Sequence, residues 1–214
     1  MVRGVNMDIQ LALDRVTIED ALAIVKETEE YIDLIEVGTS LIKEYGIESV
    51  RKIKNAYPHK RVVADIKTID NAEYEFNLCF DAGADIATVM GVSSIETIKK
   101  CLQITNKKQK IVMVDLLNTT ENKRNQLFSL SNPNVIFCDH LSKDEQEISG
   151  KRNTFSHLDN VWSIRYAVAG GITTDSVDQL VDKKLEIAII GSAITNSSKP
   201  EKTAKRFKEL LKGL

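Results

Sequence analysis

Two charged residues stand near the end of one short apolar segment, and their types could do chemistry. The segment Arg61–Asp70 reads R-V-V-A-D-I-K-T-I-D, and its branched apolar residues predict a strand buried on both faces. Asp65 and Lys67 are two residues apart, so in a regular strand both side chains point to the same side. Because an unpaired buried charge is costly, the pair is either a structural ion pair or a metal ligand beside a group that stabilises an anion.

Other apolar segments also end in residues that can bind a metal ion or move a proton. Most of these residues are acidic, and one is a histidine. The set at the predicted strand ends comprises Asp14, Glu36, Asp65, Lys67, Asp70, Asp115 and His140. A random placement of charges would not repeat this position on so many segments, so the pattern favours a functional site over a set of structural ion pairs.

The elements that must position these residues alternate along the chain. Eight apolar segments predict strands, each followed by a helical pattern, with no linker between them. The predicted strands are Asp8–Asp14, Ile32–Val37, Val62–Ile66, Ile86–Met90, Lys110–Leu116, Val135–Cys138, Arg165–Ala169 and Glu186–Ile190. The helical patterns cover 17–30, 40–55 with an interruption at Tyr45-Gly46, 72–82, 93–105, 122–130, 174–182 and 200–211, and residues 142–162 predict one or two short helices.

Eight such units in 214 residues predict an α/β fold, a TIM (β/α)₈ barrel in one compact domain. We expect the barrel to span residues 8–214, after an N-terminal extension of residues 1–7 that need not be ordered. An open doubly wound sheet is the alternative. Its Gly-rich dinucleotide loop is absent, because Asp14-Arg15-Val16 follows the first strand. In a TIM barrel the carboxyl ends of the strands form the active site, which gathers the polar set at one mouth.

Glu36 and Asp65, from adjacent strands, are the candidate metal ligands. Two carboxylates together with sugar oxygens would suit Mg²⁺, a hard cation that takes oxygen ligands and retains water. Lys67 could then stabilise an enediolate oxyanion, and His140 could move a proton. This chemistry is proton abstraction, or a change of a C–C bond, next to the carbonyl of a sugar phosphate.

Two glycine-bearing strand ends form a second signal. Gly170-Gly171 follows the seventh strand, and Gly191-Ser192 follows the eighth. Barrel enzymes frequently bind phosphate at these two positions through backbone N–H groups and a short extra helix, here expected at 193–195. The alternative is that the glycines only make tight turns, but both positions together favour phosphate binding.

Position in the chain separates the three histidines. His140 follows a predicted strand, although it could also be a loop histidine bonded to the backbone. His59 precedes a strand and therefore belongs to the face that usually serves stability. His157 lies in the poorly patterned segment, where we expect an exposed side chain.

The composition excludes several classes of protein. The net charge of −2 does not indicate binding to nucleic acid, and the sequence has no polybasic patch for a membrane surface. No apolar run approaches a transmembrane helix, and the N-terminus lacks the apolar core of a signal peptide. The three widely spaced cysteines, Cys79, Cys101 and Cys138, predict buried free thiols. We therefore expect a cytoplasmic protein that acts on a small molecule.

Five motifs in combination resemble the orotidine 5′-monophosphate decarboxylase superfamily. They are L-A-L-D at 11–14, I-E-V-G-T at 35–39, A-D-I-K-T-I-D at 64–70, A-G-G-I at 169–172 and G-S-A-I-T at 191–195. The resemblance covers essentially the whole chain from Asp8. It implies a homodimeric TIM barrel in which Glu36 and Asp65 bind Mg²⁺ and Lys67 lies near the enediolate.

The resemblance also implies roles for the other residues of the set. Asp70 would reach into the partner subunit's site, Asp14 would contact substrate hydroxyls, and His140 would transfer a proton. Asp115 is a further candidate for substrate binding. The backbone at Gly171, Gly191 and Ser192 would hold the phosphate.

Within the superfamily the chain is similar to the branch of 3-hexulose-6-phosphate synthases and 3-keto-L-gulonate-6-phosphate decarboxylases. V-D-L-L-N at 114–118, T-V-M-G-V at 88–92 and the small Ser192 are similar to the synthase pattern. They favour the aldol reaction of ribulose 5-phosphate with formaldehyde, or its reverse. The alternatives are the decarboxylase activity and a non-catalytic phosphosugar-binding barrel; an epimerase-like isomerase would want a metal site richer in histidine. Residues 71–73 and Lys143 depart from the family pattern.

Overall fold

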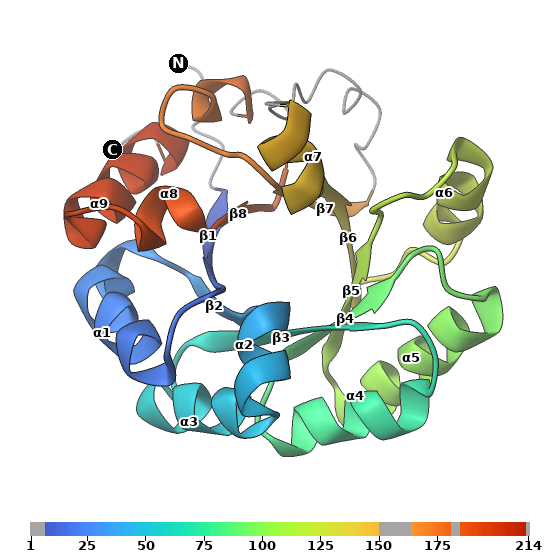
Figure 1. Ribbon diagram of the computed structural model, residues 1–214. Helices are drawn as coiled ribbons and strands as arrows, with labels where there is room; N and C mark the ends of the chain where they lie inside the picture. The colour runs from blue at the N-terminus through green and yellow to red at the C-terminus, as the bar shows by residue number, and fades with distance from the viewer. Residues whose placement is uncertain (1–6, 150–163, 181–184, 213–214) are drawn as a thin grey trace.

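Eight parallel strands close into a barrel in the order of the sequence, which confirms the predicted fold class. The computed structural model describes residues 7–149, 164–180 and 185–212. Figure 1 looks along the barrel and shows the strands as an inner ring with helices outside it. The strands are β1 (Asp8–Leu13), β2 (Leu34–Val37), β3 (Arg61–Thr68), β4 (Ile86–Met90), β5 (Ile111–Asp115), β6 (Val135–His140), β7 (Arg165–Ala169) and β8 (Ile187–Ile190).

The helices follow the predicted alternation, with one difference. They are α1 (Ile18–Thr28), η1 (Glu29–Tyr31), α2 (Thr39–Tyr45), α3 (Glu48–Ala56), α4 (Ala72–Asp81), α5 (Ile95–Lys108), α6 (Glu121–Phe128), α7 (Lys143–Ser149), η2 (Val177–Leu180), α8 (Ser192–Thr195) and α9 (Pro200–Lys212). The predicted interruption at Tyr45-Gly46 separates α2 from α3, and Gly46 has φ +68°. In the described part, the helix predicted at 174–182 is a four-residue 3₁₀ helix, and it follows a tight turn in which Thr173 and Ser176 bond each other.

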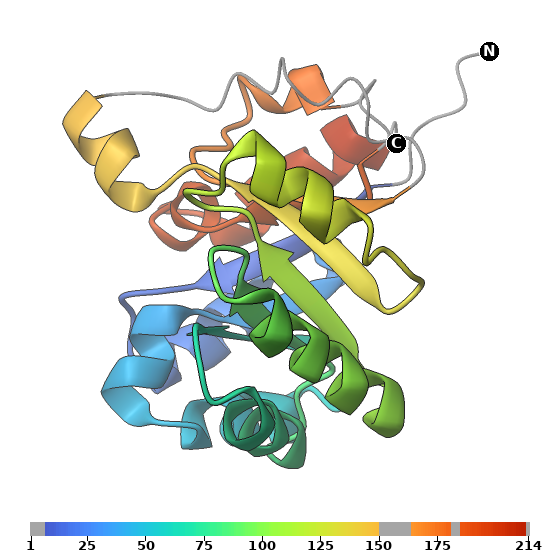
Figure 2. The ribbon, with the colours of Figure 1, turned by 90° about the vertical axis from the view of Figure 1, so that its right-hand side faces the viewer.

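The strands have two apolar faces. Their interior side chains fill the barrel, and their outer side chains pack against the ring of helices. The interior cluster comprises Leu34, Val63, Ile86, Met113, Ile136, Cys138, Ala167, Ala169, Ile187 and Ile189. Met7, just before β1, is fully buried in the outer layer. Figure 2 shows α2 and α7 extending beyond the strands on the side toward which the strands point, and this side is the mouth of the barrel.

One strand is irregular where the charged pair lies. The register between β3 and β4 shifts between Ala64 and Thr68, and Lys67 has φ +52°, a left-handed conformation that is uncommon for a non-glycine residue. The N–H of Lys67 is bonded to Oγ1 of Thr88 at 2.9 Å. A regular alternation of side chains therefore does not extend through this end of β3.

Several smaller predictions can be compared with the structure. The three cysteines are free and buried, as expected, and burial raises the pKa of the Cys79 and Cys101 thiols to about 12. His59 lies in the turn before β3, where Nε2 contacts Oε1 of Glu29 at 2.5 Å. His157 and residues 1–6 of the predicted extension lie outside the described residues. Within the described ranges, no helix has both the length and the apolar character to cross a bilayer.

Candidate active site

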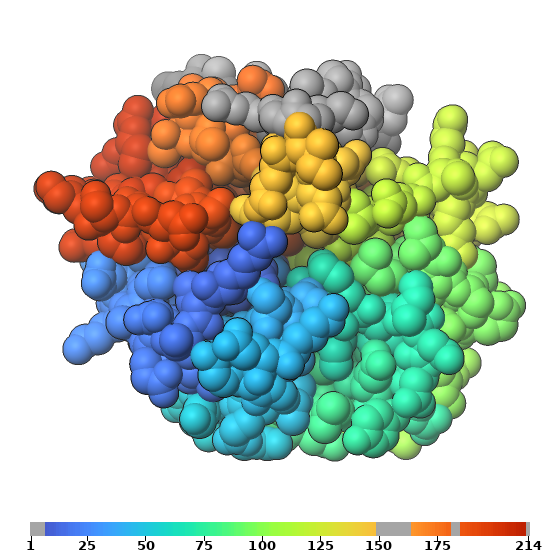
Figure 3. Space-filling view, in the orientation of Figure 1, coloured from blue at the N-terminus to red at the C-terminus, as the bar shows by residue number. Residues whose placement is uncertain are grey.

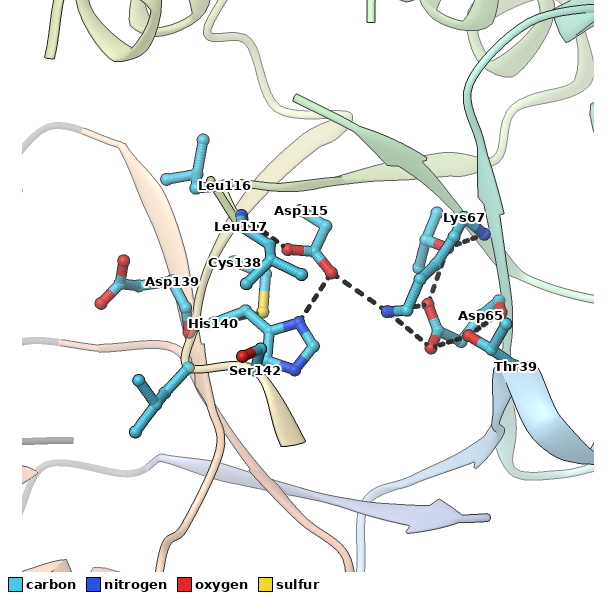
Figure 4. Close-up of polar contacts among 12 residues, drawn as sticks. Thr39, Asp65, Lys67, Asp115, Leu116, Leu117, Cys138, Asp139, His140 and Ser142 are labelled. Carbon is cyan, nitrogen blue, oxygen red and sulfur yellow. Dashed lines mark hydrogen bonds and ion pairs between the residues drawn. The ribbon is translucent and has the colours of Figure 1, made fainter. Parts of the chain in front are cut away.

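Lys67 is placed between two carboxylates at the mouth of the barrel. Its Nζ lies 3.0 Å from Oδ2 of Asp65 on the same strand and 3.1 Å from Oδ2 of Asp115 on β5 (Figure 4). Burial acts to lower the pKa of Lys67, but the two carboxylates outweigh it and raise the pKa above its ordinary value. Lys67 is therefore a fixed cation, as a group that stabilises an oxyanion must be.

Asp115 connects Lys67 to His140. The same oxygen, Oδ2, contacts Nδ1 of His140 at 2.8 Å, and Oδ1 accepts the N–H of Leu117 at 2.9 Å (Figure 4). Burial acts to raise the pKa of Asp115, but His140 and then Lys67 outweigh it and lower the pKa to about 2. Because an ionised Asp115 can only accept, Nδ1 carries a proton in this contact, which leaves Nε2 of His140 for proton exchange.

Two threonines hold the carboxylate of Asp65. Oγ1 of Thr39, the first residue of α2, lies 2.7 Å from Oδ2, and Oγ1 of Thr88 donates to Oδ1 at 2.9 Å. Thr88 Oγ1 also accepts the backbone N–H of Lys67, so one hydroxyl group bonds both Asp65 and Lys67. The orientation of Asp65 and Lys67 thus depends on α2 and β4 as well as on their own strand.

Glu36 faces the same space from β2 and is only 7% exposed. Burial, then the charges of Asp65 and Asp14, raise the pKa of Glu36 to about 8. Three carboxyl groups, those of Glu36, Asp65 and Asp14, thus interact near the cation Lys67. This excess of acidic groups fits a site for a divalent cation. Among the described residues no three His, Cys, Asp or Glu side chains form a ready metal cluster. Two carboxylates completed by substrate oxygens and water are a usual Mg²⁺ site, so Glu36 and Asp65 fit this ion.

Asp14 and Asp70 lie apart from the contacts that join Lys67, Asp65, Asp115 and His140. Asp14 is exposed and accepts the N–H of Ser40 at 3.0 Å, together with its hydroxyl. Asp70 is also exposed, and its Oδ1 accepts the N–H of Asn71 at 2.7 Å. Within one chain, Asp70 makes no hydrogen bond to another residue of the predicted set.

The glycine-bearing ends of β7 and β8 lie on neighbouring strands. Gly170 and Gly171 have φ +98° and +67°, and a Cβ at Gly170 would run into the backbone of Leu141. Gly191 precedes the single turn of α8, which begins at Ser192. Turn geometry accounts for the first two glycines, so phosphate binding at Gly171, Gly191 and Ser192 stays a prediction.

Helix α7 lies over the mouth and is linked to the first strand's loop. Arg15 and Glu147 form an ion pair at 3.2 Å, and Figure 3 shows the blue N-terminal part of the chain meeting the gold α7 near the middle of this face. Lys143, which departs from the family pattern, is 3.9 Å from Glu147. This ion pair is within α7 and involves no residue of the predicted set.

A surface hollow of about 550 Å³ lies elsewhere, beside α1, η1 and α9. Its lining consists of Lys26, Glu27, Glu29, Glu30, Tyr31, Lys60 and Glu201. None of these belongs to the predicted set. The chemistry-bearing side chains converge at the barrel mouth, so the mouth is the stronger candidate for the active site.

Three polar residues that contact the site were not predicted. Thr39 and Thr88 bond Asp65, and Gln10 of β1 donates from Nε2 to Oε2 of Glu36 at 2.5 Å. Gln10 is the polar residue in I-Q-L-A-L, and Thr88 opens T-V-M-G-V. A polar side chain among residues that face the interior was the signal that could have identified Gln10.

Comparison with known proteins agrees with the fold. The family model described as "Orotidine 5'-phosphate decarboxylase / HUMPS family" matches residues 7–207. A 3-hexulose-6-phosphate synthase of Bacillus subtilis is 36% identical over 211 residues, which cover 96% of this chain and 99% of that protein. The crystal structure of a 3-hexulose-6-phosphate synthase from Salmonella typhimurium has a TM-score of 0.89 at 32% identity and covers 96% of this chain and 98% of its own.

A 3-keto-L-gulonate-6-phosphate decarboxylase from Vibrio cholerae also matches, with a TM-score of 0.84 at 25% identity, over 96% of this chain and 97% of its own. Both kinds of relative are lyases, which confirms the prediction of an enzyme of that class. The chain belongs to the orotidine 5′-phosphate decarboxylase / HUMPS family.

Proposed function

We propose that this chain is a Mg²⁺-dependent aldehyde lyase of the 3-hexulose-6-phosphate synthase type. It would join ribulose 5-phosphate to formaldehyde, giving a hexulose 6-phosphate, and catalyse the reverse reaction. The observation that carries the proposal is the placement of Lys67 against Oδ2 of Asp115, the oxygen that also contacts His140. A fixed cation and a proton-exchanging group beside one another are what enediolate chemistry next to a carbonyl requires.

The residues divide the work of the forward reaction between them. Nε2 of His140 takes a proton from C1 of ribulose 5-phosphate, and the ammonium of Lys67 stabilises the enediolate oxygen that results. C1 then bonds to the carbon of formaldehyde, and the proton returns to the former aldehyde oxygen. Asp115 keeps His140 in the tautomer that this needs, while Asp14 contacts substrate hydroxyls. When bound at Glu36 and Asp65, Mg²⁺ supplies a positive charge that favours ionisation next to the carbonyl.

The remaining parts of the proposal concern binding and assembly. The backbone at Gly171, Gly191 and Ser192 would hold the phosphate group. The enzyme would be a cytoplasmic homodimer in which Asp70 reaches the partner subunit's site. The exposed position of Asp70 is compatible with this assignment.

The test is a coupled assay for hexulose phosphate with ribulose 5-phosphate, formaldehyde and Mg²⁺. Turnover that is lost with a chelator, restored by Mg²⁺ and abolished in Lys67→Ala supports the proposal. Turnover that survives both the chelator and the substitution overturns it. Phosphosugar binding without turnover in any assay would favour the non-catalytic alternative.

The second candidate is decarboxylation of 3-keto-L-gulonate 6-phosphate. The full-length likeness to a decarboxylase structure supports it, and the same Lys67 could stabilise the enediolate left after CO₂ departs. CO₂ release from this substrate, without condensation of formaldehyde, would favour the second candidate over the first. The synthase-like motifs and the 36% identical synthase favour the first.

A further inference from the structure

A buried amide points into the barrel one step deeper than Glu36. Gln10 is fully buried, and it pairs in register with Leu34 on β2 and Ile189 on β8. Both partners belong to the interior cluster, and residues in register on neighbouring strands point to the same side of a sheet. The members of that cluster are all apolar, so an amide beside them needs an explanation of its own.

Packing alone does not explain an amide at this position, because Nε2 of Gln10 is hydrogen-bonded and Oε1 is not. Nε2 donates to Oε2 of Glu36 at 2.5 Å. Oε1 is fully buried and has no hydrogen-bond partner, and no other side-chain nitrogen or oxygen atom in the described ranges shares that condition. An apolar side chain of similar size would avoid the cost of this unpaired oxygen. The bond to Glu36 is therefore the feature that only an amide supplies here.

The bond has a consequence for the other oxygen of Glu36. Oε1 of Glu36 accepts no hydrogen bond from the described residues, yet it is not among the fully buried unpaired atoms. It therefore faces accessible space at the mouth. Because a carboxylate is planar, a bond that fixes Oε2 restricts the direction of Oε1 as well. An amide does this without adding charge, whereas an acid at position 10 would repel Glu36 and a lysine would neutralise it.

We propose that Gln10 is a positioning residue for the metal site: it holds Oε2 of Glu36 so that Oε1 is presented to the cation. The inference rests on the proposed function, in the part that assigns Mg²⁺ to Glu36 and Asp65. Partners that orient metal ligands typically contribute roughly 10- to 100-fold to metal affinity. Loss of the Gln10 bond should therefore weaken cation binding by about this factor.

The experiment measures binding of Mn²⁺ alone, as a paramagnetic substitute for Mg²⁺, from the EPR signal of the free ion. Gln10→Met and Gln10→Leu remove the donor while keeping a side chain of similar size. Thr105→Val is the matched control, because Thr105 is also fully buried but donates within α5, to the carbonyl of Leu102 at 2.9 Å. Urea unfolding of each apo protein reports on the fold, and Glu36→Gln removes one ligand.

The expected result is Mn²⁺ affinity that is lowered about 10- to 100-fold in both Gln10 variants, unchanged in Thr105→Val, with cooperative unfolding in all. Wild-type affinity in Gln10→Met, together with lost binding in Glu36→Gln, overturns the inference and leaves the proposed metal site standing. Failure of the wild-type protein to bind Mn²⁺ or Mg²⁺ overturns both. Loss of cooperative unfolding in both Gln10 variants overturns the inference too, because it would show that Gln10 is required for folding of the core.

Discussion

The ammonium of Lys67 on β3 lies 3.1 Å from Oδ2 of Asp115 on β5, so this ion pair crosses the width of β4 at the barrel mouth. The same oxygen contacts His140 on β6. A charge at Lys67 and a proton at His140 are therefore coupled through a single carboxylate. Substitutions at these residues should therefore change the activity, and changes of pH should alter the stability.

Lys67→Met should lower kcat by about 10²–10³-fold or more, because it removes the cation that stabilises the developing oxyanion. The assay is hexulose phosphate formation, with phosphosugar binding measured separately by calorimetry. Lys54→Met is the matched control, since Lys54 pairs with Asp85 at 2.8 Å on the opposite side of the barrel from the mouth. A control that loses as much activity as Lys67→Met would contradict the assignment.

Asp115→Asn should remove a pH-dependent part of the stability. The pKa of Asp115 is lowered to about 2, so its stabilising contribution is present above the unfolded-state pKa near 4 and is lost as pH falls toward 2. At 1.36 kcal/mol per pKa unit this contribution is about 2 kcal/mol. The difference in unfolding free energy between wild type and Asp115→Asn, measured by urea unfolding, should be constant at pH 5–7 and shrink below about pH 4. A difference that stays constant down to pH 2.5 would contradict the ion-pair account.

The sequence predicted the convergence of Glu36, Asp65, Asp115 and His140 for a physical reason. Parallel strands of a closed barrel end at one mouth, and charges that recur at strand ends must meet there. The placement of Asp65 and Lys67 on one side of the strand was also expected, but from a regular alternation of side chains. The structure reaches it through a left-handed Lys67 and a register shift.

The parts that could not be predicted depend on contacts between distant segments. The left-handed conformation of Lys67 has no local signal, since I-K-T-I contains no glycine or asparagine. The backbone N–H of Lys67 is bonded instead to the hydroxyl of Thr88 on β4, a residue distant in sequence. The bond from Gln10 to Glu36 depends on the register of β1 with β2. The position of Asp70 is set by an exposed turn after β3, so a function in a second subunit cannot be derived from one chain.

Metal binding should depend on pH through Glu36. The pKa of Glu36 is raised to about 8, so protonation of Glu36 stabilises the folded apo protein. This stabilisation is fully present below the unfolded-state pKa near 4.5 and is lost as pH rises through 8. Because Mg²⁺ needs the ionised carboxylate, we expect its affinity to rise from pH 6 to 8 with release of up to one proton. Calorimetry in two buffers of different ionisation enthalpy measures that proton. Binding without net proton release at pH 7, or an affinity that does not change between pH 6 and 8, would contradict the assignment to Glu36.

Thr88→Val should lower kcat by roughly 10- to 100-fold, whereas Thr88→Ser should retain most of it. Valine keeps the shape of threonine but removes both the donor to Asp65 and the acceptor for the Lys67 N–H, and such supporting bonds typically matter to this extent. KM for the phosphosugar should change little, because the proposed phosphate site lies at the ends of β7 and β8 and not beside β4. Equal loss in the serine and valine variants would show that packing, and not the hydroxyl, is what matters at this position.

Asp70→Asn and Lys67→Met should each be inactive alone and active when mixed, if Asp70 completes the partner subunit's site. Random exchange of subunits makes half of the dimers mixed, and each mixed dimer has one site with both Lys67 and Asp70 intact, so about a quarter of wild-type activity should return. The variants are mixed after mild denaturation and refolding, and their mass is checked by light scattering. Mixing each variant with itself is the control. A monomeric mass by light scattering, or mixed dimers without activity, would show that Asp70 does not contribute to the partner subunit's site.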